Sequence, residues 1–180
     1  MLEQVIMAGF GGQGVLLAGK LLAYAGIIES REVCWVPFYG TEMRGGRVSC
    51  IISISDKDID SPIIESFDTL LAFDQTSLSQ FEGLVKAGGL VIWNNSLIKK
   101  EPERKDSKSI AVKLNEIANV IGNAKVVNMI MLGVYHSQKR LFSKESFFQA
   151  MEDFFPPRLS DFTSLNRRAF IEGSILGEKL

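Results

Sequence analysis

The sequence has few of the residues that carry redox and metal chemistry, with two cysteines and one histidine among 180 residues. Cys34 and Cys50 have no neighbour in a CxxC spacing, and two thiols fall short of the set that ligates an iron–sulfur cluster. No Cys/His array has the spacing of a zinc site. Both cysteines stand among β-branched residues typical of strands, which predicts buried, reduced thiols. We therefore expect no cluster or structural metal on this chain.

The sequence also lacks an excess of charge of either sign and any long apolar run. Its formal net charge is −1, so the composition does not favour binding to nucleic acid or to an anionic membrane. No apolar run approaches the roughly 20 residues that a membrane-spanning helix requires. The first residues show neither the cationic start nor the cleavage site of a signal peptide. These features predict a cytoplasmic protein with no nucleic-acid or membrane partner.

What the sequence does contain is the pattern of an α/β fold, in a chain long enough for one domain with its own core. Short apolar runs predict buried strands, and apolar residues at three- and four-residue spacing predict the helices between them. Arg47–Ser55 instead alternates between apolar residues and serines, which predicts a half-exposed strand, antiparallel or near an edge. We expect a Rossmann-like, doubly wound, mostly parallel sheet with at least one such strand, forming a single domain over residues 1–180.

Caps and breakers suggest where these elements begin and end. The predicted strands are Val5–Ala8, Val33–Val36 (stopped by Pro37), Arg47–Ser55, Leu70–Phe73, Leu90–Trp93 and Lys125–Val127. The predicted helices are Val15–Ser30, one over 78–85 ended by Gly88-Gly89, one through Ile117 and Ile121, Met129–His136, one capped by Ser143, and Phe162–Leu180. Residues 99–109 are dense in charge and predict a solvated surface loop. An aromatic stripe, typical of a core or a subunit interface, comprises Phe147, Phe148, Phe154 and Phe155.

A glycine-rich loop joins the first predicted strand to the first predicted helix. It reads Gly9-Phe10-Gly11-Gly12-Gln13-Gly14 and fits the G-x-G-x-x-G pattern. In that pattern Gly9 permits the tight turn, Gly11 lets backbone amides approach a phosphate, and Gly14 lets the helix lie close to the strand. The free amides and positive dipole at the start of the helix favour an anion. The alternative is a tight strand–helix turn that binds nothing.

The remainder of a dinucleotide-binding signature is missing. An NAD-binding fold needs an acidic residue near the end of the second strand to bind the ribose hydroxyls. Cys34–Tyr39 contains no acid, and the first one to follow is Glu42. No Lys-Ser/Thr pair follows the glycine loop either, so a P-loop is excluded.

A second unusual segment follows the second predicted strand. It reads Tyr39-Gly40-Thr41-Glu42-Met43-Arg44-Gly45-Gly46-Arg47. In a Rossmann-type sheet this loop lies at the carboxyl edge, beside the glycine loop. Two arginines around a Gly-Gly pair offer guanidinium groups on a backbone that a phosphate or carboxylate can approach closely. The alternative is an ordinary turn in which an arginine forms a salt bridge with Glu42.

Residues for a self-contained catalytic site are not apparent. His136 is the only histidine, and it stands at the end of a mostly apolar helix with no acid or nucleophile as its evident partner. The sequence indicates a capping or surface histidine there. Neither G-x-S-x-G nor H-E-x-x-H occurs.

The two glycine-bearing segments, in this order, resemble one family. The resemblance includes Leu16, Ala18 and Gly19 after the first loop, then Ile54-Ser55-Asp56, Ile59, Ser61-Pro62 and Asp68. The family is the gamma subunit, or gamma domain, of the pyruvate, ketoisovalerate and 2-oxoglutarate:ferredoxin oxidoreductases. The resemblance covers most of the chain and is densest over residues 5–75. In that family the gamma part is associated with subunit assembly and, in some members, with the coenzyme A end of the active site. The resemblance implies a working edge lined by Gly11, Gly12, Gln13, Tyr39, Thr41, Glu42, Arg44, Gly45 and Gly46. Together with Gly9 and Gly14 of the glycine loop, these are the candidate cofactor-binding residues.

The resemblance further implies a multi-subunit enzyme that decarboxylates a 2-oxoacid and yields an acyl-coenzyme A. Thiamine diphosphate and iron–sulfur clusters are expected on its alpha and beta subunits and on a ferredoxin-like delta subunit or domain, with ferredoxin as electron acceptor. This chain alone is expected to be inactive. The amino-acid sequence of the second segment looks more like that of the enzymes for 2-oxoglutarate and branched-chain 2-oxoacids than that of the indolepyruvate type. The alternative is a stand-alone nucleotide-binding module or the NAD(P)-binding domain of a dehydrogenase, which the missing acid disfavours.

Overall fold

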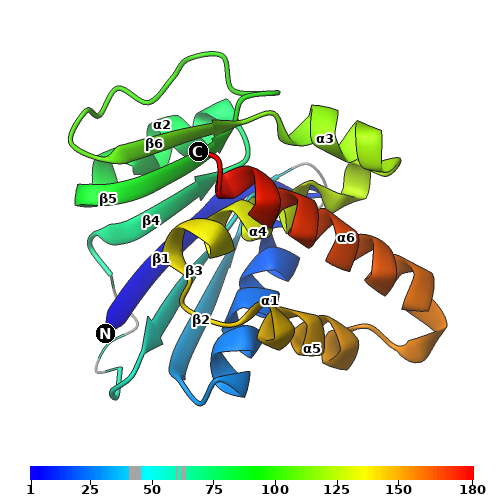
Figure 1. Cartoon of the computed structure of the whole chain (residues 1–180). Coiled ribbons are helices and arrows are strands. Elements are labelled where there is room, and N and C mark those ends of the chain that lie inside the picture. The colour runs from blue at the N-terminus through cyan, green and yellow to red at the C-terminus, as the bar shows by residue number, and fades with distance from the viewer. Residues whose placement is uncertain (41–45, 60, 62–63) are drawn as a thin grey trace.

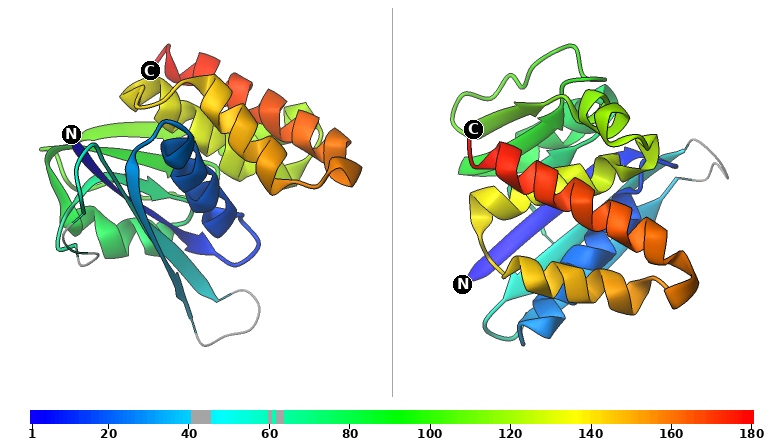
Figure 2. Two further views of the ribbon diagram at one scale, coloured as in Figure 1. Left: turned by 90° about the horizontal axis from the view of Figure 1, so that it is seen from below. Right: turned by 45° about the vertical axis from the view of Figure 1, so that its right-hand side comes forward.

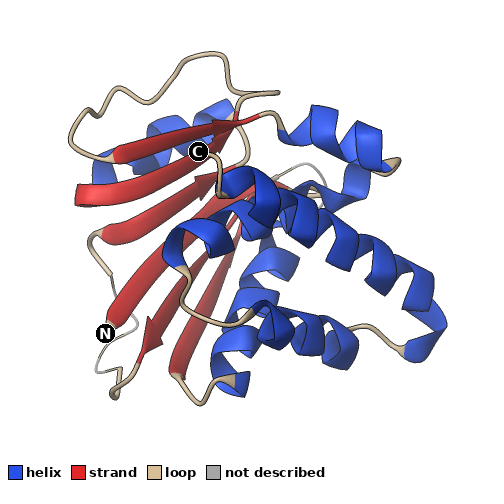
Figure 3. Cartoon of the chain, in the orientation of Figure 1, coloured by secondary structure: helices blue, strands red, loops and turns tan. Residues whose placement is uncertain are grey.

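The computed structural model describes residues 1–40, 46–59, 61 and 64–180, and a six-stranded sheet runs through its centre (Figures 1 and 3). The strands are β1 (Leu2–Phe10), β2 (Glu32–Tyr39), β3 (Arg47–Ser55), β4 (Phe67–Ala72), β5 (Val85–Asn94) and β6 (Lys108–Val112). Their order across the sheet is β2-β3-β1-β4-β5-β6. β3 is antiparallel to both of its neighbours, and the pairings of β1, β4, β5 and β6 are parallel. The predicted fold class is therefore confirmed, including the off-pattern strand at 47–55.

The helices cover the two faces of the sheet unequally (Figure 2). They are α1 (Val15–Ile28), α2 (Gln75–Phe81), α3 (Leu114–Ile121), α4 (Val127–Lys139), α5 (Lys144–Phe154) and α6 (Ser160–Gly177), with short 3-10 turns at Glu82–Leu84, Ala124–Val126 and Pro157–Leu159. α1 and α3 to α6 contribute to one large apolar cluster, whereas α2 contributes to a smaller cluster on the other face. No helix among the described residues is long and apolar enough to cross a membrane.

Alternation along the strands divides the core between these two clusters. On β3, Cys50 and Ile52 are fully buried in the larger cluster. On β1, Ile6 belongs to the smaller cluster beneath α2. The alternating pattern of 47–55 predicts a half-exposed serine face on β3, but Ser53 and Ser55 are only 1% and 5% exposed. β3 lies between β1 and β2, one strand in from the edge of the sheet.

β2 runs through Pro37 to Tyr39, so the expectation that Pro37 stops the strand is wrong. The Gly40 amide donates to the Arg47 carbonyl at 2.9 Å, which shows that even-numbered residues of β2 point their backbone groups toward β3. The backbone of Pro37 therefore faces the open edge of the sheet. Its missing N–H costs no ladder hydrogen bond at that position, and it also makes the edge a poor template for another strand.

Three further boundary predictions are wrong. Gly88-Gly89 does not cap a helix but lies inside β5, where the register with β4 shifts and Gly88 has a φ of 76°. The predicted strand Lys125–Val127 is a 3-10 turn that leads into α4. β6 begins at Lys108, inside the segment predicted to be loop up to residue 109.

The helical layer on the larger face depends on small residues where α4 meets α6. A Cβ added at Gly133 would lie 2.1 Å from the Phe170 carbonyl oxygen, and one at Gly173 would lie 2.2 Å from the Ile130 carbonyl oxygen. No side chain fits between helices this close. The predicted Ser143 cap of α5 is confirmed, because its hydroxyl accepts from the Ser146 amide at 3.2 Å.

The aromatic stripe of α5 packs largely within the chain. Phe147 and Phe155 are 1% and 8% exposed, and Phe148 and Phe154 are partly buried against the same cluster. This burial weakens the case that the stripe serves a subunit interface. Both cysteines are free thiols: Cys50 is buried, as predicted, while Cys34 is only partly buried.

Candidate functional site

The neighbouring parallel strands β1 and β4 form a topological switch point. The chain leaves β1 for α1 on one face of the sheet and leaves β4 for α2 on the other face. In doubly wound folds, ligands bind in the crevice beyond the carboxyl ends of such strands. The glycine loop 10–14 follows β1 directly and therefore lies at this crevice.

The glycines of this loop are required by its geometry. Gly12 and Gly14 adopt φ angles of 101° and 75°, a region that side chains disfavour. A Cβ added at Gly9 would lie 2.9 Å from the Phe73 Cβ and 3.0 Å from the Val15 Cγ2. The predicted tight turn and close packing of strand on helix are therefore present. As the N-cap of α1, Gly14 offers no side chain to cap the helix.

Two amide side chains fill the space around the loop. The Gln13 Oε1 atom accepts from the Phe10 amide at 2.7 Å, and its Nε2 atom lies 3.4 Å from the Phe73 carbonyl oxygen. From α4, the Asn128 Nδ2 atom donates to the Gly14 carbonyl at 3.1 Å. Asn128 is 1% exposed, and its side chain occupies the space that a Cβ on Gly14 would need. Sequence reasoning missed Asn128, because nothing local marks a contact between segments so distant in the chain.

The structure brings the two predicted segments together. The Gly11 amide donates to the Gly46 carbonyl at 2.9 Å, in the register of the β1–β3 ladder. Tyr39 ends β2 next to this junction and is 69% exposed. Four predicted site residues, Thr41, Glu42, Arg44 and Gly45, lie outside the described residues. Gly9, Gly11, Gly12, Gln13, Gly14, Tyr39 and Gly46 all lie at the carboxyl edge.

A cleft of about 160 Å³ opens at this edge, on the face that α2 covers. Its floor includes the cross-strand neighbours Ala8, Ser49 and Phe38, from β1, β3 and β2. The other lining residues are Gly9, Tyr39, Gly40, Arg47 and Val48 of the sheet edge, and Ser77, Gln80 and Phe81 of α2. The cleft thus combines a cation with hydroxyl groups and aromatic rings.

Arg47 is the charged group of this cleft. It is exposed, and it forms no ion pair with any residue that the structure describes. Phe38, at 48% exposure, presents an aromatic surface in the same cleft. A guanidinium beside an aromatic ring suits an anionic ligand that also carries a planar group. The sequence pointed to Arg47 through the second segment, whereas Ser77 and Phe81 of α2 carried no signal.

Two other titratable candidates, His136 and Cys50, are packed among other residues of the fold. His136 is half-buried between Phe147 and Phe170, and its Nε2 atom lies 3.1 Å from the Phe142 carbonyl oxygen. Burial lowers the pKa of His136 below its ordinary value of 6.5, so it is a neutral packing residue. Of the capping and surface roles that the sequence indicated, the surface role is wrong. Burial likewise raises the pKa of the Cys50 thiol to about 12, which makes it inert at neutral pH.

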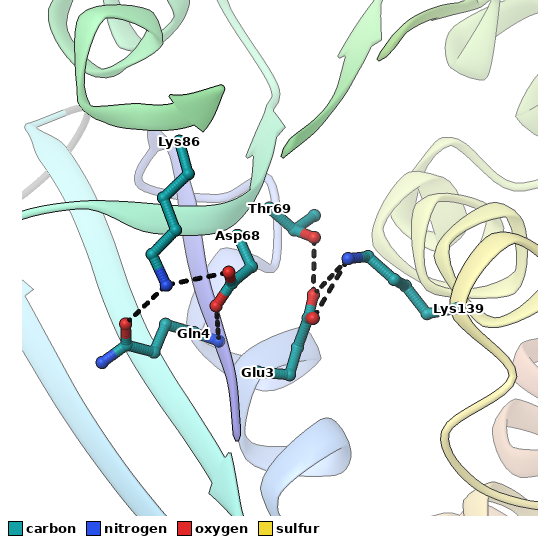
Figure 4. A network of polar contacts seen from close by, with 6 residues as sticks. All are labelled: Glu3, Gln4, Asp68, Thr69, Lys86 and Lys139. Carbon is teal, nitrogen blue, oxygen red and sulfur yellow. Dashed lines mark hydrogen bonds and ion pairs between the residues drawn. The ribbon is translucent and has the colours of Figure 1, made fainter. Parts of the chain in front are cut away.

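The amino edge of the sheet carries paired charges (Figure 4). Glu3 is 7% exposed, accepts from the Thr69 hydroxyl at 2.7 Å and pairs with Lys139 at 3.0 Å. On the other face, Asp68 pairs with Lys86 at 2.8 Å and accepts from the backbone amide of Gln4 at 2.9 Å. Each carboxylate therefore has both a cation and a neutral donor.

The profile of one protein family, described as pyruvate ferredoxin/flavodoxin oxidoreductase, matches residues 4–175. The chain belongs to this family. The resemblance found in the sequence is confirmed. The subunits of such enzymes are oxidoreductase components, and the two glycine-bearing segments at the carboxyl edge lie within the matched region.

Three known proteins are similar to this chain. It is 41% identical over 131 residues to a ketoisovalerate oxidoreductase subunit of Methanothermobacter marburgensis, covering 73% of this chain and 27% of that protein. It therefore spans about a quarter of the length of that relative. The gamma subunit of a keto/oxoacid ferredoxin oxidoreductase from Geobacter sulfurreducens is 28% identical, has a TM-score of 0.84 and matches over 99% of both chains.

The third protein shares the fold at lower identity. It is a 2-oxoglutarate:ferredoxin oxidoreductase from Magnetococcus marinus, solved with 2-oxoglutarate, coenzyme A and succinyl-CoA bound. Its sequence identity is 20% and its TM-score is 0.91. The match covers 99% of this chain and 31% of the Magnetococcus marinus chain. The same fold thus occurs both as a separate subunit and as part of a longer chain.

Proposed function

We propose that this chain is the gamma-type component of a 2-oxoacid:ferredoxin oxidoreductase and that residues 1–180 form one such domain. The observation that carries this proposal is the hydrogen bond between Gly11 and Gly46, which joins the two family motifs into one surface at the carboxyl edge. The switch point of a doubly wound sheet lies at the same edge. We infer that this surface works in the assembled enzyme, together with the predicted site residues Thr41, Glu42, Arg44 and Gly45.

The proposed role of this edge is to hold part of coenzyme A, whose thiol accepts the acyl group that the enzyme releases. A cleft of about 160 Å³ accommodates a phosphate or a ring but not a whole coenzyme A molecule. Arg47 would hold a phosphate, and the ring of Phe38 would pack against a planar group. Gly40 is exposed and lacks a side chain at the rim, so a ligand can approach the backbone there.

The remaining chemistry is proposed for partner subunits. Thiamine diphosphate would be held by alpha and beta subunits, and the iron–sulfur clusters by a ferredoxin-like delta subunit or domain that passes electrons to ferredoxin. The sequence supports this division because it has no thiamine-binding motif and only two cysteines. The relatives named for ketoisovalerate and 2-oxoglutarate support a 2-oxoacid as substrate. A cytoplasmic location remains a prediction from the sequence.

Kinetics of the assembled enzyme test the role of the edge. We expect Arg47→Ala to raise the KM for coenzyme A by roughly tenfold to a hundredfold, the effect of losing one charge-assisted contact. The kcat should change little if the contact is equal in the ground and transition states. The sequence makes the same prediction for Arg44→Ala. The matched control is Arg168→Ala, which removes an exposed arginine from α6. An unchanged KM in fully assembled Arg47→Ala enzyme would contradict the proposed role.

A further inference from the structure

The side chain of Gln13 lies in the switch-point crevice itself. Its carboxamide joins the two strands that border the crevice: Oε1 accepts from the Phe10 amide at the end of β1 at 2.7 Å, and Nε2 lies 3.4 Å from the carbonyl oxygen of Phe73, just after β4. The backbone closes the same junction, because the Phe73 amide donates to the Ala8 carbonyl at 2.9 Å. A side chain of this chain thus occupies the place where doubly wound folds bind nucleotides.

The backbone amides of the loop are also engaged within the chain. The Phe10 amide donates to the Gln13 side chain, the Gly11 amide to Gly46 at 2.9 Å, and the Gln13 amide to the Phe10 carbonyl at 3.2 Å. A diphosphate in a G-x-G-x-x-G loop depends on free amides of this kind. The loop therefore keeps the dinucleotide-binding sequence pattern while three of its amides are already satisfied.

The packing around Gly9 explains why the first position of the G-x-G-x-x-G pattern is a glycine. A Cβ added at Gly9 would lie 2.4 Å from the Gln13 Oε1 atom, so any larger residue would displace the carboxamide. The first glycine of the motif, which permits the tight turn in a dinucleotide-binding domain, here also makes room for a side chain of the same loop. This packing explains the need for glycine without invoking a bound phosphate.

We propose that Gln13 is a specificity-determining residue that closes the switch-point crevice to dinucleotides and fixes the glycine loop against Gly46. This inference deepens the proposed function, because it leaves the neighbouring cleft at Arg47 as the place where a ligand binds. It also gives a structural reason, beyond the missing acid after β2, why this fold would not act as an NAD(P)-binding domain.

The test measures binding of ADP-ribose to the purified chain by calorimetry. Wild type should bind it weakly or not detectably, and Gln13→Ala should bind it at least about tenfold more tightly, because two hydrogen-bonding positions and the crevice become available. Gln13→Met is the matched control, since methionine fills a similar volume without the carboxamide, and its affinity should stay near that of wild type. Tight wild-type binding, or a folded Gln13→Ala chain with no gain, would overturn the inference.

A second measurement guards against a variant that is merely misfolded. Hydrogen exchange of the Phe10 amide should accelerate in both Gln13→Ala and Gln13→Met, while core amides of β4 exchange as in wild type. A Phe10 amide that exchanges at the wild-type rate in both variants would contradict the role assigned to the carboxamide. The ADP-ribose experiment uses the chain alone, so its failure is distinct from a failure of the coenzyme A kinetics in the assembled enzyme.

Discussion

The two edges of the sheet differ in how their polar groups are satisfied. At the amino edge, Glu3 and Asp68 each pair with a lysine and accept a further hydrogen bond (Figure 4). At the carboxyl edge, Arg47 has no ion-pair partner among the residues that the structure describes, and Phe38 and Tyr39 are 48% and 69% exposed. The charges of the amino edge are paired within the chain, whereas the carboxyl edge presents groups that other molecules can contact.

This difference indicates that the amino edge contributes to stability and the carboxyl edge to ligand binding. Removing one partner of a buried ion pair destabilises the fold, because the other charge is left buried without compensation. An exposed cation beside aromatic rings adds little to stability and is available to a ligand. Substitutions at the two edges should therefore have opposite profiles: loss of stability at the amino edge and loss of ligand affinity at the carboxyl edge.

The largest expected loss of stability comes from Lys139→Met, at about 3 kcal/mol, because it leaves the Glu3 carboxylate buried without a cation. The two side chains are only 23% and 9% exposed, so water replaces the ammonium poorly. Chemical denaturation gives the free energy of unfolding. The matched control is Lys86→Met, whose pair with Asp68 is 38% and 23% exposed and should be worth less than about 1 kcal/mol. Equal losses in the two variants would contradict this ranking.

A smaller effect is expected from Glu29, the C-cap residue of α1. Its carboxylate accepts from the Ser146 hydroxyl at 2.6 Å and from the amide and hydroxyl of Ser143, each at 2.9 Å. These hydrogen bonds, that from Ser146 first, lower the pKa of Glu29 below its ordinary value of 4.5. Glu29→Gln should therefore lower the free energy of unfolding by about 1 kcal/mol at pH 7. This loss is smaller than is usual for hydrogen bonds to a charged group, because the carboxylate borders solvent.

The pH dependence of this effect follows from the direction of the shift. A lowered folded-state pKa contributes stability that is complete above the ordinary value of 4.5 and is lost as the pH falls toward the folded-state pKa. The difference in unfolding free energy between wild type and Glu29→Gln should thus shrink as the pH is lowered from about 6 to about 3. A difference that stays constant over this range would show that the charge of Glu29 is not responsible.

Much of the carboxyl edge could be predicted because its signals are local. The glycine loop, the helix that follows it and the strand at 47–55 each depend on neighbours in the sequence, and each is present in the structure. The proximity of the two glycine-bearing segments also followed from the general rule for doubly wound sheets. The contact between Gly11 and Gly46 realises that expectation.

The errors have a shared physical cause, which is that tertiary context decided the outcome. Pro37 normally stops a strand, but here its backbone faces an open sheet edge where no donor is needed. A glycine pair after a helical pattern usually ends a helix, but Gly88 lies at an irregularity within β5. The position of Asn128 against Gly14 and the internal engagement of Gln13 depend on three-dimensional packing that no periodicity encodes.

Hydrogen–deuterium exchange of the assembled enzyme, with and without coenzyme A, tests most directly whether the carboxyl edge is the working edge. We predict that coenzyme A slows exchange in peptides that cover 38–40 and 47–49, which line the cleft. Peptides that cover 2–5 and 135–139, at the amino edge, should be unchanged. Protection confined to the amino edge, or no change anywhere in this chain, would contradict the account.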